Sequence, residues 1–146
     1  MNLLGVMEIS GSALRAERER AEVLASNMAN AQTTHTPKGG PYRAQLVVFR
    51  TRNMAQGTFA GVLSGFRDQY AQGVEVMRVV ADPTPPVQRY EPGHPDADSQ
   101  GYVAYPAINP IEEMVNLMGA ARSFEFNVAA VQATKNMISE SFEIVR

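Results

Sequence analysis

The sequence predicts an α+β protein. Two long terminal helices pair as an antiparallel coiled coil, and a small, mostly antiparallel β and loop insert lies between them. The first 30 or so residues contain no proline and are rich in helix-forming Ala, Leu, Met, Glu and Arg. The middle of the chain holds eight of the nine prolines, and an apolar seven-residue repeat runs through the last part. We therefore expect a helical domain made of residues 1–35 and 106–146, and an outer insert made of residues 36–105.

The first predicted helix covers about residues 3–30. One apolar column recurs every seven residues and comprises Met7, Leu14 and Met28, with Ala21 between the last two. The companion column is interrupted by Ser10 and Glu17. A seven-residue apolar repeat is typical of a helix that packs along another helix.

The second predicted helix begins after Asn109 and carries the clearer pattern. Asn109 suits the N-cap, Pro110 suits the first helical position, and Glu112 follows three residues after the cap. Large apolar residues then repeat every seven positions in two columns: Leu117, Phe124, Val131 and Ile138 in one, and Met114, Val128 and Phe142 in the other. These columns predict a left-handed coiled-coil interface.

Each helix also carries a second apolar stripe, made of Ile9 and Val23 on the first helix and of Phe126 and Met137 on the second. These residues follow the main columns by two positions, which is about 200° around a helix. One partner helix cannot cover both faces. Either the middle of the chain folds over the second stripe, or neighbouring copies in an assembly cover it.

The middle of the chain predicts two strands, at residues 42–50 and 74–80, where β-branched and aromatic residues cluster after turn signals. The glycine-spaced segment 57–65 fits either a hairpin tip or a loop. The proline-rich segment 82–86 cannot be a central strand, because proline donates no hydrogen bond to a sheet. We expect an extended connector there.

Composition excludes several classes of protein and site. The net charge is −2 with both signs scattered along the chain, so a nucleic acid is not the expected partner. There is no cysteine, which excludes disulfides and thiolate metal sites. No apolar run is long enough to span a bilayer. The short apolar start lacks a basic region before it, so we expect no cleaved signal peptide.

The most enzyme-like fragment runs from Glu91 to Asp98 and places His94 near Asp96 and Asp98. Such a group suggests a metal site or an acid–base pair. A rigid turn explains the same fragment better, because two prolines and a glycine restrict the backbone and Asp side chains bond to nearby amides. We therefore predict no catalytic residue, metal or cofactor.

Three stretches resemble the bacterial flagellar rod proteins. The first contains Asn27, Asn30, Gly40, Pro41 and Tyr42. The second is similar to the central signature of a proximal-rod member and contains Pro92, Gly93, His94, Pro95, Asp96, Asp98, Gly101 and Tyr102. The segment from Glu112 to Arg122 resembles the C-terminal helix of the same member. Segments 57–65 and 82–86 depart from that family's pattern.

The resemblance implies a structural subunit of the proximal rod of the flagellar basal body. Such subunits leave the cell through the flagellar type III export apparatus and polymerise helically into a periplasmic drive shaft that transmits torque around an export channel. The expected partners are further copies, other rod proteins, the basal-body base (MS) ring and the export apparatus. Two other classes stay open from the sequence: a helical adaptor or export chaperone, and a metal-dependent enzyme centred on His94.

Overall fold

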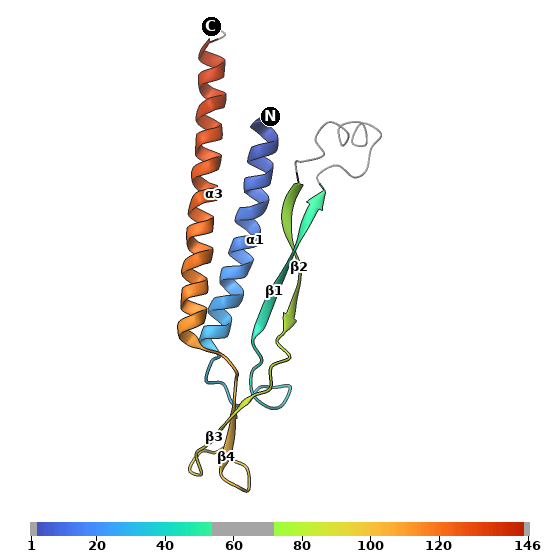
Figure 1. Ribbon diagram of the computed structural model, residues 1–146, viewed down its shortest axis with the longest axis vertical. Coiled ribbons are helices and arrows are strands. Elements are labelled where there is room, and N and C mark those ends of the chain that lie inside the picture. The colour runs from blue at the N-terminus through green and yellow to red at the C-terminus, as the bar shows by residue number, and fades with distance from the viewer. Residues whose placement is uncertain (1–2, 54–71, 145–146) are drawn as a thin grey trace. The chain divides into compact units, whose positions relative to one another are not determined.

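The computed structural model describes residues 3–53 and 72–144 (Figure 1). The predicted segment 57–65 lies outside the described residues. Within them, two helices flank four strands in the order α1 (Leu3–Ala29), β1 (Gln45–Asn53), β2 (Gln72–Ala81), β3 (Val87–Tyr90), β4 (Tyr102–Tyr105) and α3 (Pro110–Ile144). The α+β class with two terminal helices and a small antiparallel insert is confirmed. None of the helices that the structure describes is long and apolar enough to cross a membrane.

Both predicted helices are present. α3 starts at the predicted proline, and the side-chain Oδ1 of Asn109 accepts a hydrogen bond from the backbone N–H of Ile111 at 3.1 Å. This bond satisfies one of the amide groups that a helix leaves unpaired at its N-terminus. Glu112 and Glu113 lie in the first turn, where the helix dipole favours negative charge.

The strands β1 and β2 form a two-stranded sheet. β2 covers the predicted segment 74–80, whereas β1 begins at Gln45 and not at Tyr42. The three residues before Gln45 have other bonding partners. The backbone N–H of Tyr42 donates to the carbonyl of Thr33, and the carbonyl of Ala44 accepts from the N–H of Asp82. These bonds hold the chain in a loop before the strand starts.

A second hairpin, made of β3 and β4, was not expected from the sequence. The two strands pair antiparallel, with Val87 opposite Tyr105 and Tyr90 opposite Tyr102. Residues 82–86 form the expected extended connector that leads into it. Each strand has only four residues, which is too short to show a clear alternation of apolar and polar side chains.

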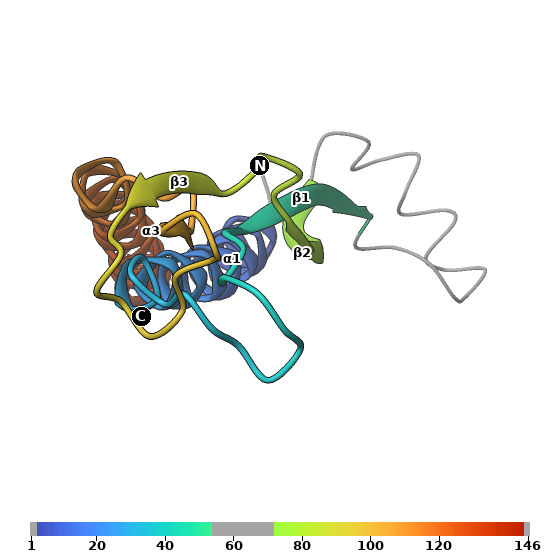
Figure 2. The ribbon, with the colours of Figure 1, turned by 90° about the horizontal axis from the view of Figure 1, so that it is seen from below.

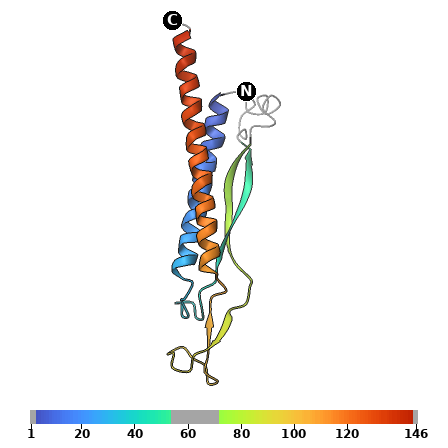
Figure 3. The same ribbon diagram turned by 60° about the vertical axis from the view of Figure 1, so that its left-hand side comes forward.

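The chain divides into two compact units. Unit 1 comprises Met1–Glu19, Phe49–Met77 and Ala120–Arg146. Within it, the described parts of α1 and α3 run side by side in opposite directions (Figures 1 and 3). Its fully buried side chains are small, among them Ser12, Ala16, Ala120 and Thr134. The Oγ of Ser12 accepts a hydrogen bond from the N–H of Val74 at 3.0 Å, which ties α1 to β2.

Unit 2 comprises Arg20–Val48 and Arg78–Gly119. It contains the end of α1, the start of α3, the β3–β4 hairpin, and the loop that leads from α1 to β1, coloured cyan in Figure 2. Its buried side chains include Asn27, Ala44 and Val103. Sequence analysis predicted a helical domain of residues 1–35 and 106–146 and an outer insert of residues 36–105. That division stays a prediction.

Candidate assembly surface and motif sites

Asn27 is the most fully bonded side chain of the first motif. It lies near the end of α1 and is 1% exposed. Its Nδ2 donates to the carbonyl of Gln45 at 2.9 Å and to Oε2 of Glu113 at 3.1 Å. Its Oδ1 accepts from the N–H of Gln45 at 2.8 Å and from the hydroxyl of Tyr42 at 3.2 Å. A carboxamide has two donor hydrogens and two acceptor positions, so every hydrogen-bonding capacity of Asn27 is used.

Asn30 ends the helix and starts the following loop. Its Nδ2 donates to the carbonyl of Ser26 at 2.9 Å, and its Oδ1 accepts from the hydroxyl of Thr33 at 3.2 Å. Further along, Gly39 and Gly40 have φ values of 86° and 71°, a left-handed conformation that glycine adopts readily. The motif residues up to Pro41 therefore shape the turn that returns the chain toward β1.

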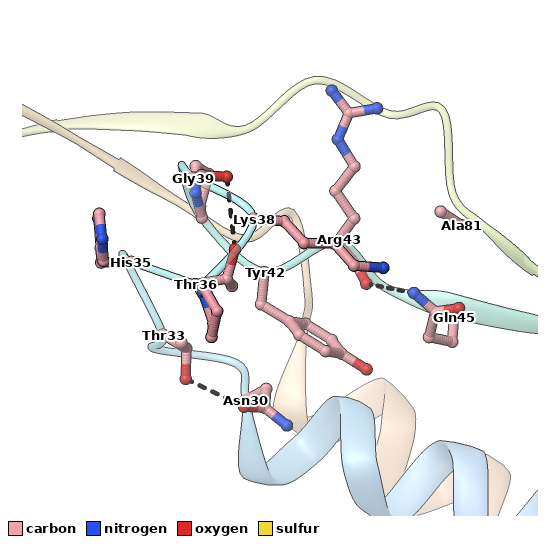
Figure 4. A pocket seen from close by; sticks show the side chains of 12 residues that line it. Asn30, Thr33, His35, Thr36, Lys38, Gly39, Tyr42, Arg43, Gln45 and Ala81 are labelled. Carbon is pink, nitrogen blue, oxygen red and sulfur yellow. Dashed lines mark hydrogen bonds between the residues drawn. The ribbon is translucent and has the colours of Figure 1, made fainter.

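This loop also encloses a pocket of about 580 Å³ within unit 2 (Figure 4). Its lining includes the cationic side chains of Lys38 and Arg43, together with His35, Tyr42 and Ala81. None of the lining residues is a carboxylate. The pocket is thus basic, and nothing within it points to a particular ligand.

The second motif forms a chain of turns between β3 and β4. Asp98 organises its end, because Oδ1 of Asp98 accepts from the N–H groups of Gln100 and Tyr102 at 2.8 and 2.9 Å. The N–H of His94 donates to the carbonyl of Glu91 at 3.0 Å. The exposed Pro92, Gly93 and Pro95 belong to the same turns. This arrangement is the rigid turn predicted from the sequence.

Gly101 is required by both conformation and space. Its φ is 83°, and a Cβ added there would lie 2.9 Å from the Tyr90 ring and 3.1 Å from Cβ of Pro92. The ring of Tyr90 also meets that of Tyr102 edge to face, with centroids 5.4 Å apart. A side chain at position 101 would therefore strain the backbone and displace this aromatic pair.

His94 and Asp96 are neighbours, but their geometry is that of a turn. The N–H of Asp96 donates to Nδ1 of His94 at 3.1 Å, and the Oδ2 of Asp96 accepts from the hydroxyl of Thr34 at 2.7 Å. The second bond links the loop after α1 to the hairpin loop. Among residues 3–53 and 72–144, no three His, Asp or Glu side chains are grouped so that they could hold a metal ion.

Two side chains of unit 2 have shifted pKa values. The backbone N–H and the hydroxyl of Thr84 both donate to Asp82, which stabilises the carboxylate and lowers its pKa. The hydroxyl of Tyr105 donates to Oε2 of Glu91 at 2.8 Å, which raises the pKa of Tyr105. Arg89 lies over the Tyr105 ring, 4.8 Å from its centroid. The Tyr105 contacts link the two strands of the hairpin, and the Asp82 contacts fix the connector before it.

The predicted seven-residue columns are only partly covered within one chain. Met7, Leu14, Met28, Leu117, Val128, Val131 and Ile138 are partly buried. Met114, Phe124 and Phe142 are exposed. The buried positions of α3 are instead Ala120 and Thr134, which lie in a column of smaller and polar residues. The assignment of the large apolar residues to an assembly interface stays a prediction.

The second apolar stripe differs between the two helices. On α1, Ile9 and Val23 are partly buried, and Ala16 between them is buried. The bond from Val74 to Ser12 shows that β2 covers this side of α1 in unit 1. On α3, Phe126 is 76% exposed and Met137 is 47% exposed. The middle of the chain therefore covers part of the α1 stripe, whereas the α3 stripe stays open.

The first two turns of α3 carry an exposed apolar patch of which sequence analysis singled out only Met114. Ile111, Met114, Val115 and Met118 are all exposed and recur three or four residues apart. Such residues share one face of a helix. Sequence reasoning also missed Glu113 and Gln45 as partners of Asn27. Glu113 lies 86 residues from Asn27, and no local pattern marks such a contact.

Comparisons with known proteins match both ends of the chain. A family model described as flagella basal body rod protein matches residues 7–34. A second, described as flagellar basal body rod FlgEFG protein C-terminal, matches residues 99–143. The two matches include the Asn27 and Asn30 motif, the end of the hairpin loop and nearly all of α3.

Relatives that match over nearly the whole chain include several proteins named flagellar basal-body rod protein FlgC. A flagellar basal-body rod protein FlgC of Escherichia coli O6:H1 is 40% identical over 144 residues, which cover 99% of this chain and 98% of the relative. Its counterpart in Borreliella burgdorferi is 33% identical over 151 residues, covering 100% of this chain and 99% of the relative. The counterpart in Bacillus subtilis is 34% identical over 142 residues, covering 94% and 95%.

Proposed function

Because this chain belongs to the FlgC family of flagellar basal-body rod proteins, we propose that it is a structural subunit of the proximal rod that polymerises helically with other rod proteins. The relatives match it over nearly its whole length, so the proposal rests on both ends and the middle of the sequence and not on one shared module. The family is structural, and we assign no catalytic role.

The observation that carries this proposal is the set of large apolar side chains that α3 leaves exposed on more than one side. Phe126 and Phe142 are 76% and 74% exposed, and Ile111 is 73% exposed. Burying a large apolar side chain contributes roughly 1.5–3 kcal/mol. Several such residues along one helix favour a partner that covers them. Neighbouring rod subunits would supply this cover.

The exposed apolar side chains of α3 also suggest how assembly is controlled. Within a single chain, the fully buried side chains of the two helices are small or polar, whereas several large apolar side chains of α3 are exposed. We infer that the terminal helices gain further stability when neighbours bind. Coupled ordering of this kind discourages polymerisation before export through the type III apparatus.

In the assembled rod, we infer that the paired helices lie around the export channel and that the β insert lies outside them. A rod built this way transmits torque by close packing of subunits from the MS ring outward. The hairpin loop from Glu91 to Gly101 is exposed over most of its length and is bonded internally, so it is suited to contacts that must not deform.

Fractionation tests the proposed function. The gene is deleted and then restored, and basal bodies are purified from both strains. We expect the deletion strain to lose swimming, and the restored chain to co-purify with intact basal bodies. A chain that stays in the cytosolic fraction, with basal bodies still complete, would support a chaperone or adaptor and contradict a rod subunit.

A further inference from the structure

Unit 2 joins the end of α1, the start of α3 and the start of β1 through very few buried groups. Between Arg20 and Ala29, Asn27 is the only residue that is buried. No residue from Pro110 to Gly119 is buried. The apolar residues Leu24, Met28 and Leu117 are each partly exposed. These apolar side chains are covered only in part and their packing has no direction, so a directional polar contact is better suited to select one register of α3 against α1.

The hydrogen bonds of Asn27 supply the direction that apolar packing lacks. Its Nδ2 donates at once to Glu113 of α3 and to the carbonyl of Gln45 at the start of β1. Its Oδ1 accepts from the N–H of Gln45 and from the hydroxyl of Tyr42. A shift of α3 along α1 by one residue would move its side chains by about 1.5 Å and rotate them by about 100°. Such a shift breaks the bond to Glu113.

We propose that Asn27 is a positioning residue whose side-chain amide sets the register of α3 against α1 and fixes where β1 begins. This inference rests on the proposed function, because the exposed patch of Ile111, Met114, Val115 and Met118 lies on the same two turns of α3 as Glu113. The register of those turns decides where the patch meets a neighbouring subunit. A buried polar residue that specifies helix register is a known use of asparagine.

Only an amide satisfies this site. Aspartate has the same shape but no donor, so Asn27→Asp would set a carboxylate against the Glu113 carboxylate and the Gln45 carbonyl. Replacing Glu113 restores complementarity at that partner, whereas the Gln45 carbonyl still faces the carboxylate. In the double variant Asn27→Asp with Glu113→Gln, the new amide at position 113 donates to the new carboxylate at position 27. The titratable groups that the structure places against Asn27 are Glu113 and Tyr42.

The test compares four variants in a strain that lacks the chromosomal gene, with the chain quantified in purified basal bodies and in whole cells. We expect Asn27→Asp to reduce incorporation about tenfold or more, in line with the loss of a hydrogen bond to a charged group. Glu113→Gln retains an oxygen acceptor and should stay within about twofold of wild type. The double variant should recover a clear part of the loss.

The matched control is Asn27→Asp combined with Glu112→Gln. Glu112 is exposed in the same helical turn, so this variant removes the same charge without replacing the partner of Asn27. It should not recover. If the two double variants incorporate equally, or if Asn27→Asp incorporates normally, the inference is wrong.

Amide hydrogen exchange in the purified full chain gives an independent readout. Asn27→Asp keeps the oxygen that accepts from the Gln45 N–H, but its carboxylate repels the Glu113 carboxylate and the Gln45 carbonyl. This repulsion should open the start of β1 and speed exchange of the Gln45 N–H about tenfold. Adding Glu113→Gln removes one of the two repulsions and should slow the exchange again. An unchanged rate in Asn27→Asp would contradict the inference. Absence of the wild-type chain from basal bodies would instead contradict the proposed function, and the exchange rates would still decide the role of Asn27.

Discussion

Hydrogen bonding and backbone conformation explain the residue types found at key positions of the two sequence motifs. Asn27 uses all four hydrogen-bonding positions of its amide, and Asp98 accepts two backbone N–H groups in the hairpin loop. Gly101 combines a φ of 83° with a site that leaves no room for a Cβ. These contacts fix the backbone of the two motifs.

Gly101→Ala tests the steric account of the hairpin. We expect it to destabilise the β3–β4 hairpin by about 1–3 kcal/mol, because Ala in a left-handed conformation is strained and its Cβ meets Tyr90 and Pro92. Amide exchange of the Val103 N–H measures the effect. Gly93→Ala is the control, because a Cβ at position 93 meets nothing within 4 Å. Equal effects of the two substitutions would contradict the account.

Asp82 gives a prediction that depends on pH. Hydrogen bonds from Thr84 lower the pKa of Asp82, so its stabilising effect on the folded connector is present above the pKa of the unfolded chain. That effect is lost as pH falls through the folded-state pKa. Thr84→Val removes the hydroxyl donor and should raise the pKa of Asp82 toward its usual value. An NMR titration of the Asp82 carboxyl measures the change in its pKa, and Ser99→Ala is the control. If Thr84→Val leaves the pKa of Asp82 unchanged, the hydroxyl of Thr84 does not lower it.

At the level of elements, the sequence predicted both helices, the start of α3, β2 and the connector at residues 82–86. These signals are local, because they depend on helix propensity, capping and proline. The β3–β4 hairpin was missed because two four-residue strands separated by an eleven-residue loop carry little local signal. The contact between Asn27 and Glu113 joins residues far apart in the chain, so no periodicity marks it.

The cap of α3 is open to direct test. Asn109→Ala removes the acceptor for the Ile111 N–H and should cost about 1 kcal/mol of helix stability. We expect lower helical content in the purified chain by circular dichroism. Asn109→Asp retains the acceptor oxygen and serves as control. If alanine and aspartate give the same helical content, the side chain of Asn109 does not cap this helix.

At the level of the whole molecule, α3 buries small side chains within the chain and exposes large apolar ones. Under the proposed function, neighbouring subunits cover these exposed side chains. Phe126→Glu should leave the purified chain as stable as wild type, because Phe126 is 76% exposed. It should nevertheless prevent incorporation into basal bodies, since a charge buried between subunits costs several kcal/mol. Glu125→Gln, at the adjacent exposed position, should incorporate normally.

Electron cryo-microscopy of intact basal bodies, with this chain traced in the rod, tests the central claim most directly. We expect density for the chain in the proximal rod, with Phe126 and the patch of Ile111, Met114, Val115 and Met118 covered by neighbouring subunits. A rod that is complete without this chain, or a traced chain whose α3 face stays open to solvent, would contradict the proposal.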